Sequence, residues 1–166
     1  DPEIIEPLPN KNNQSRCAAG FGRLGSLSSP KTFDEIMVFL EEKLGLKNMQ
    51  WLKSSWTKNA AKKGLKYQKE EKIRKIAVIN GSANSLTKRF LSPELDCDLV
   101  IAGELKYSNA SMIAESGRAV IVAGHAETEK FAIDGIYDRI KKSKKLKDID
   151  IIKSEKGYFP WRYYIE

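Results

Sequence analysis

Three short apolar runs, each closed by a glycine and a polar residue, alternate with helical segments between residues 72 and 142. The runs cover residues 73–79, 98–102 and 119–123, and the pairs that close them are Gly81-Ser82, Gly103-Glu104 and Gly124-His125. Short apolar strands that alternate with helices build a parallel sheet whose two faces are both covered. We therefore predict an α/β fold with a mostly parallel sheet and helices on both faces.

The segments around these runs extend the same architecture. Thr32 and Glu35 have the spacing of a capping box and Gly45 is a typical helix stop, so a helix is expected over 33–44. Further helices are expected through Leu86 and Phe90, over 108–115, and from 125 to about 142. Short strands are expected near 4–5, over 49–52 and, as the last strand, over 149–152.

The boundaries of the domain follow from composition. Residues 1–16 are interrupted by prolines and polar residues and are expected to form an extended lead-in. Residues 17–157 are expected to form one α/β domain with a basic linker at about 58–72, and residues 158–166 an aromatic tail.

His125 is the only histidine in the chain, and Glu129 follows it at helical i,i+4 spacing. Side chains so spaced lie side by side on one helix face, within reach of a single metal ion. Ile133, Ile136 and Ile140 continue the same stripe, so both ligands are expected at the start of a buried face. The alternative is that His125 is structural and bonds a carbonyl, while Glu129 pairs with a lysine.

Binding crevices in open parallel sheets form at the carboxyl ends of the strands. If the three central strands are neighbours, Ser82, Glu104, His125 and Glu129 converge on one edge of the sheet. A single histidine leaves such a metal site short of ligands, because zinc usually takes three or four from the protein.

The run Gly20-Phe21-Gly22-Arg23-Leu24-Gly25 matches the G-x-G-x-x-G pattern of dinucleotide-binding loops. Such a loop must open directly into a helix, whereas here the next helix begins only after Thr32. Close strand packing or a bend is the preferred interpretation.

Composition narrows the classes of protein. The hydrophobic fraction of 41% and the charged fraction of 31% are typical of a soluble globular domain. No apolar run approaches the roughly 20 residues of a membrane helix, so no membrane partner is expected. Cys17 and Cys97 lack metal-ligand spacing and are expected to be reduced thiols of an intracellular protein. We expect a cytoplasmic location, with the mitochondrion and the nucleus as alternatives.

The formal net charge is +7, and lysines gather at 58–75 and 141–147. Such stretches attract nucleic acid by neutralising phosphates, which makes nucleic acid a candidate partner. The alternative is a solvated linker and helix face.

Three runs of residues together resemble the C-terminal half of the Nif-three-like family, whose members are often labelled GTP cyclohydrolase type-two homologues. The runs are Asn80-Gly81-Ser82-Ala83-Asn84, the segment 98–107 with its Gly-Glu pair, and the segment 123–129 with Gly-His-x-x-x-Glu. The resemblance extends from about residue 15 to residue 152.

The resemblance implies a ring-like homo-oligomer that binds two divalent metal ions per complete subunit, with zinc, iron, manganese or magnesium as the candidates. By resemblance, His125 and Glu129 are the metal ligands of this half. A paired histidine motif and an aspartate complete the site from the family's N-terminal half, which this sequence does not contain and which is therefore an expected partner.

Two functions follow as expectations. The first is a metal-dependent hydrolase that acts on a nucleotide or phosphorylated substrate once the missing half is supplied, with Ser82 and Glu104 lining the pocket and this chain alone inactive. The second is an oligomeric binding or scaffold protein whose basic surfaces meet nucleic acid or protein partners, with the metal structural or vestigial.

Overall fold

A computed structural model of the chain describes residues 2–7, 20–46, 48–53, 72–143, 146, 149–154 and 156. The chain divides into two compact units, Asp1–Thr128 and Glu129–Glu166. Cys17, the aromatic tail and most of the first lysine-rich stretch lie outside the described residues.

The described part of the first unit is built on one sheet of six strands in the order β1-β2-β4-β5-β6-β3. The strands are β1 (Glu3–Pro7), β2 (Gly20–Lys31), β3 (Gln50–Leu52), β4 (Ile73–Ser82), β5 (Leu99–Glu104) and β6 (Ala119–Val122). The β4–β5 and β5–β6 pairs are parallel, while β1–β2, β2–β4 and β3–β6 are antiparallel. The α/β class is confirmed, but the expected "mostly parallel" sheet is a mixed sheet with a parallel centre.

The parallel centre is the most deeply buried part of the chain. In β5 every residue from Leu99 to Gly103 is buried, and Val100 and Ala102 are fully inaccessible. A strand covered on both faces has an unbroken apolar sequence, because neither row of side chains meets water. The run that predicted this strand is therefore also the reason that it lies in the middle of the sheet.

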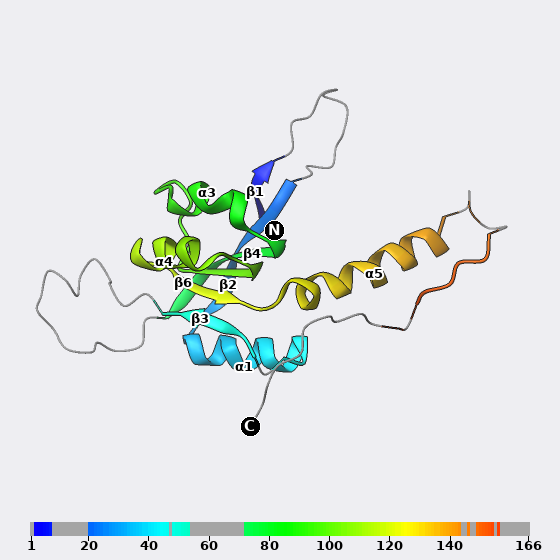
Figure 1. The fold of residues 1–166 in the computed structure, drawn as a ribbon, viewed down its shortest axis with the longest axis horizontal. Helices are drawn as coiled ribbons and strands as arrows, with labels where there is room; N and C mark the ends of the chain where they lie inside the picture. The colour runs from blue at the N-terminus through cyan, green and yellow to red at the C-terminus, as the bar shows by residue number, and fades with distance from the viewer. Residues whose placement is uncertain are drawn as a thin grey trace, which may run out of the picture. The chain divides into compact units, whose positions relative to one another are not determined.

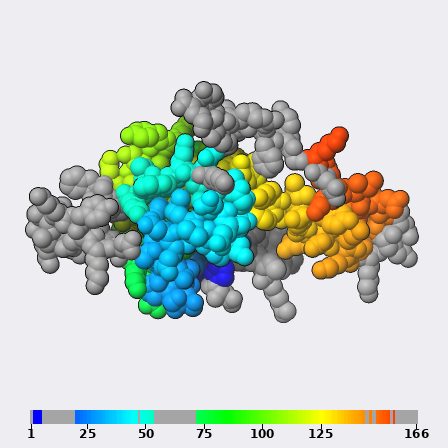
Figure 2. Space-filling view, turned by 90° about the horizontal axis from the view of Figure 1, so that it is seen from below, coloured from blue at the N-terminus to red at the C-terminus, as the bar shows by residue number. Residues whose placement is uncertain are grey.

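Helices cover both faces of the sheet in the first unit, as Figure 1 shows. On one face α1 (Phe33–Leu44) buries Phe33 and Ile36 against a cluster that includes Leu99 and Ile121. Figure 2 shows α1, in blue, on the visible face of the first unit, beside β3 in cyan. On the other face lie η1 (Asn84–Leu86), α3 (Thr87–Leu91) and α4 (Tyr107–Glu115), with Phe90 and Ile113 in the core.

The G-x-G-x-x-G run lies inside strand β2 and not in a phosphate-binding loop. Gly22 has a positive φ of 67°, which glycine adopts at little cost. A Cβ at this position would lie 2.8 Å from Cδ1 of Ile5 on the neighbouring strand. Close packing between strands therefore accounts for this glycine.

The first helix begins and ends where its sequence predicts. The Thr32 hydroxyl accepts the Glu35 N–H at 3.1 Å, and the Glu35 carboxylate accepts the Thr32 N–H at 2.7 Å. Gly45 ends the helix in the left-handed conformation, with φ of 69°.

Replacing Thr32 with alanine is expected to lower the free energy of unfolding by about 1 kcal/mol, because the N–H of Glu35 loses its side-chain acceptor. For a chain of this size the midpoint of thermal unfolding should fall by about 2–4 °C. Thr32→Ser retains the hydroxyl and is the control. An unchanged midpoint in Thr32→Ala would show that the cap adds nothing to stability.

Helix α5 (His125–Lys141) extends as expected to about residue 142 and enters the second unit at Glu129. Its apolar stripe was expected to be buried, and this prediction is wrong within the part of the chain that the structure describes. Ile133 and Ile136 are 56% and 57% exposed, and His125 and Glu129 are also exposed. Helical periodicity marks an apolar stripe but does not supply the surface that would cover it.

The last expected strand, at 149–152, is also wrong. These residues form no strand, and Ile152 is 90% exposed. Within the second unit this segment is tied to α5 by an ion pair between Lys153 and Asp134 at 2.7 Å. Among the described helices, none has the length and apolar character needed to cross a membrane.

Candidate functional site

The carboxyl ends of the parallel strands bring the first two candidate residues together. Ser82 is the last residue of β4 and Glu104 the last of β5, and the two are paired in the register of these strands. His125 follows β6, the neighbour of β5, after Ala123 and Gly124. Gly124 has φ of 95°, a conformation that favours glycine where the chain turns from β6 into α5.

His125 and Glu104 are joined directly. Nδ1 of His125 lies 3.0 Å from Oε2 of Glu104, and the two side chains are 46% and 53% exposed. An ionised carboxylate only accepts, so the imidazole donates its Nδ1–H. In this tautomer Nε2 is the ring nitrogen with the lone pair that a metal would need.

A side-chain amide stands behind Glu104. Nδ2 of Asn84 donates to Oε1 of Glu104 at 3.2 Å and to the Ser82 hydroxyl at 3.0 Å. Oδ1 of Asn84 accepts the backbone N–H of Lys106 at 2.8 Å and an amide N–H of Asn109 at 2.9 Å. Ser82, Asn84, Glu104 and His125 therefore form one continuous network of hydrogen bonds.

The first turn of α5 is fastened to the sheet by Thr128, which is 8% exposed. Its hydroxyl accepts the backbone N–H of Gly81 at 3.0 Å and donates to the carbonyl of Gly124 or of His125, each at 3.0 Å. Gly103 packs in the same place, since a Cβ there would lie 2.5 Å from the Thr128 hydroxyl. These contacts hold His125 beside the tip of β5.

Glu129, the other expected ligand, lies one helical turn beyond His125 on α5, is exposed, and is the first residue of the second unit. Imidazole and carboxylate groups suit zinc, iron or manganese. However, the part of the chain that the structure describes holds no group of three or more His, Cys, Asp or Glu side chains placed to bind one ion. The donors fit a metal as part of a site and do not make a whole one.

Cys97, a cysteine within the described residues, is buried as a free thiol. Burial raises the pKa of the Cys97 thiol, and the nearby Arg118 guanidinium only partly opposes that effect. A thiol that stays protonated at neutral pH is a poor nucleophile, so Cys97 packs in the core and lies outside the candidate site.

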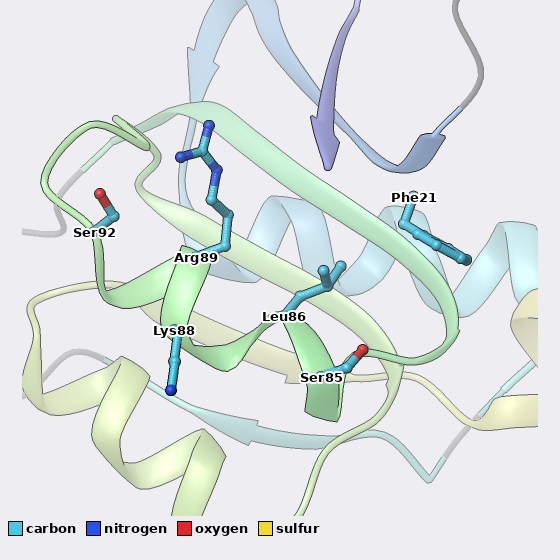
Figure 3. A pocket seen from close by; sticks show the side chains of 6 residues that line it. All are labelled: Phe21, Ser85, Leu86, Lys88, Arg89 and Ser92. Carbon is cyan, nitrogen blue, oxygen red and sulfur yellow. The ribbon is translucent and has the colours of Figure 1, made fainter. Parts of the chain in front are cut away.

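A hollow of about 490 Å³ lies elsewhere on the first unit, lined by Phe21, Ser85, Leu86, Lys88, Arg89 and Ser92. Figure 3 shows Lys88 and Arg89 extending in opposite directions from α3. The Arg89 guanidinium already donates to the Ile5 carbonyl and to Glu94, at 3.3 Å each. The two cations therefore do not converge on a common anion, and the hollow has no clear chemistry.

Asn84 is a residue of this network that was not expected from the sequence. The available signal was its position directly after a Gly-Ser strand ending, where polar side chains gather in an α/β sheet. Its partners Lys106 and Asn109 lie more than 20 residues away, and only the register of β4 and β5 brings them close.

Known proteins resemble this chain in both sequence and structure. The GTP cyclohydrolase 1 type 2 homolog of Clostridium perfringens is 26% identical over 145 residues, which cover 87% of this chain and 49% of that protein. The Protein NIF3 homolog of Schizosaccharomyces pombe is 28% identical over 128 residues, which cover 76% of this chain and 40% of that protein. The chain thus spans about half or less of the length of these curated relatives.

Solved structures show the same fold at lower identity. A Bacillus cereus protein related to NIF3 matches with a TM-score of 0.68 and 18% identity, over 89% of this chain and 36% of that one. A Staphylococcus aureus protein matches with a TM-score of 0.66 and 18% identity, over 87% and 42% of the two chains. The sequence profile of Duf34/NIF3 (NGG1p interacting factor 3) matches residues 3–157, and this chain therefore belongs to the Duf34/NIF3 family.

Proposed function

We propose that this chain supplies half of a divalent-metal site, and that the completed protein is a metal-dependent hydrolase of a nucleotide or another phosphorylated substrate. His125 and Glu129 are the metal ligands of this half, and Glu104 orients His125. The observation that carries the proposal is the 3.0 Å hydrogen bond between Nδ1 of His125 and Oε2 of Glu104 at the strand ends.

This hydrogen bond is the arrangement found around metal-binding histidines. A histidine that binds a metal through one ring nitrogen usually donates the other N–H to a carboxylate or carbonyl, which fixes the tautomer and the orientation of the ring. Glu129 follows at i+4, the spacing at which two helical side chains share one ion.

The site is proposed as a half because two ligands do not complete it. The chain covers 49% of the Clostridium perfringens relative, so relatives of that length contain a second half. We propose that this second half supplies the remaining ligands. That relative is named as a homolog of a GTP cyclohydrolase, which favours a nucleotide among the phosphorylated substrates to test first.

His125 and Glu129 would hold a divalent metal that, together with ligands from the second half, would supply Lewis acidity for a phosphoryl group. Other residues of this chain position the histidine: Glu104 fixes the His125 ring, and Thr128 fixes the helix turn that carries it. The Ser82 hydroxyl lies at the end of β4, hydrogen-bonded to Asn84, where a polar group of a substrate could bind.

Titration calorimetry with Zn²⁺ on the untagged chain tests the proposed metal binding. Structural zinc sites with four ligands are worth about 10–16 kcal/mol, so two ligands should contribute roughly 6 kcal/mol. The expected result is one ion per chain with a Kd on the order of 10–100 μM. Binding that is absent at about 1 mM Zn²⁺ would rule out the half-site.

The proposed hydrolase activity needs a separate experiment. The chain should be co-expressed with the other half of a relative, and phosphate release from a panel of nucleotides measured with Mn²⁺ or Zn²⁺ and with a chelator. Metal-dependent release that requires both halves is expected. A completed protein that binds metal and releases no phosphate would leave the metal site standing and reject the hydrolase.

The alternative, an oligomeric scaffold with basic surfaces, gains no specific support. Residues 54–71, which hold most of the first lysine-rich stretch, lie outside the described part of the chain.

A further inference from the structure

We infer that Asn84 is a positioning residue: it fixes the Glu104 carboxylate and, through it, the tautomer and orientation of the His125 ring. This inference rests on the proposed function, since its purpose is to prepare His125 for a metal. The hydrogen bonds that carry it are present without any metal, so it can be tested independently.

The Asn84 side chain uses its full hydrogen-bonding capacity. An amide offers two N–H donors and two acceptor lone pairs, and all four have partners at 2.8–3.2 Å. The orientation of the amide is not arbitrary. The Lys106 backbone N–H can only donate and the Glu104 carboxylate can only accept, so a flipped amide would oppose donor to donor and acceptor to acceptor.

Asn84 is attached to rigid parts of the fold on three sides. Its own carbonyl accepts the Thr87 hydroxyl at 2.9 Å, and the preceding Ala83 N–H donates to the Glu104 carbonyl at 3.0 Å. Through Lys106 and Asn109 it is bonded to the start of α4. Asn84 therefore links the ends of β4 and β5 to the first turn of α4.

The two carboxylate oxygens of Glu104 have different hydrogen-bond partners. Oε1 accepts from Asn84, and Oε2 faces Nδ1 of His125. A half-exposed glutamate has three side-chain torsions and would sample several rotamers if nothing held it. With Oε1 held, Oε2 stays where the imidazole N–H can reach it.

The test is the tautomer of His125 in the metal-free chain, read from two-bond ¹H–¹⁵N NMR spectra at a pH where the ring is neutral. Because an untagged chain contains one histidine, the imidazole signals need no assignment. The Nδ1–H tautomer is expected to dominate in the parent chain. In Asn84→Ala the population should move toward Nε2–H, and the affinity for Zn²⁺ should fall about 10-fold, at the low end for lost support of a metal-binding histidine.

Asn80→Ala is the matched control, since Asn80 is exposed on β4 and takes no part in the network. Its tautomer and Zn²⁺ affinity should equal those of the parent chain. If Asn84→Ala does not fold by circular dichroism, Asn84→Asp takes its place in the tautomer measurement, because it keeps the acceptor for Lys106 and opposes a carboxylate to Glu104. Adding Asn84→Ala to Glu104→Ala should change neither readout further, because residues that act through one another are not additive.

The outcomes separate this inference from the proposed function. An unchanged Nδ1–H tautomer in a folded Asn84 variant overturns the positioning role, whatever the metal does. A further shift in the double variant overturns the route through Glu104. A tautomer that changes as expected in a chain that binds no Zn²⁺ supports the role of Asn84 and rejects the metal site.

Discussion

The Gly103→Ala chain is expected to unfold about 3 kcal/mol more easily than the parent chain. The added Cβ would lie 2.5 Å from the Thr128 hydroxyl and 2.7 Å and 2.8 Å from the carbonyl oxygen and nitrogen of Gly81. Two of these three atoms belong to the backbone of β4, which cannot move without disturbing the central sheet. Overpacking of this kind costs about 1–3 kcal/mol, and rigid backbone neighbours place Gly103 at the upper end. Thermal unfolding followed by circular dichroism should show a midpoint about 6–12 °C lower.

Gly135→Ala is the opposite case in the same chain. Gly135 lies within α5, and a Cβ there would have no atom within 4 Å. Alanine in a helix interior is favoured over glycine by about 0.5–1 kcal/mol, so this variant should be at least as stable as the parent. If the two variants unfolded at the same midpoint temperature, the backbones of β4 and β5 would accommodate the added Cβ more easily than the close contacts around Gly103 indicate.

Replacement of His125 with alanine is expected to weaken Zn²⁺ binding by about 100-fold. At roughly 3 kcal/mol for each ligand, the loss of one of two ligands leaves a Kd in the millimolar range. Glu129→Gln removes the charge of the second ligand and should weaken binding as well. Calorimetry of both variants, with unfolding curves to show that each is folded, is the measurement.

Asp138→Asn provides the control for Glu129→Gln. Asp138 is an exposed carboxylate on the same helix, on the side away from the His125 stripe, and its neutralisation changes the net charge equally. Its Zn²⁺ affinity should match that of the parent chain. Equal losses in Asp138→Asn and Glu129→Gln would reduce the effect to general electrostatic attraction, and an unchanged His125→Ala chain would remove the histidine from the site.

Local signals in the sequence predicted most of the first unit. The capping box at Thr32 and the stop at Gly45 bound α1 correctly, since both depend on contacts within one or two turns. The apolar runs placed β4, β5 and β6 at the centre of the sheet, although β4 extends to Ser82 and the expected strand ends at residue 79. The strand endings likewise predicted that Ser82 and Glu104 would lie together.

What the sequence could not predict depends on distant partners. Strand β2, which is 12 residues long, is not among the strands that the sequence predicts, and the antiparallel directions of β2 and β3 are decided by pairing with strands far along the chain. The stripe of α5 specifies an apolar face, but Ile133 and Ile136 remain more than half exposed because burial requires a second surface. The role of Asn84 is visible only once four partners are seen around one amide.

The position of β3 has a consequence for the order of assembly during synthesis. Trp51 pairs with Ile121, a residue that leaves the ribosome about 70 positions later. Contacts between such distant residues close a long loop and form late in folding. Strands β1, β2 and β4 can begin to pair while translation continues, but β3 has no partner until β6 has been made. Strand β3, an edge strand among those that the structure describes, is therefore added to the sheet only after β6 has been made.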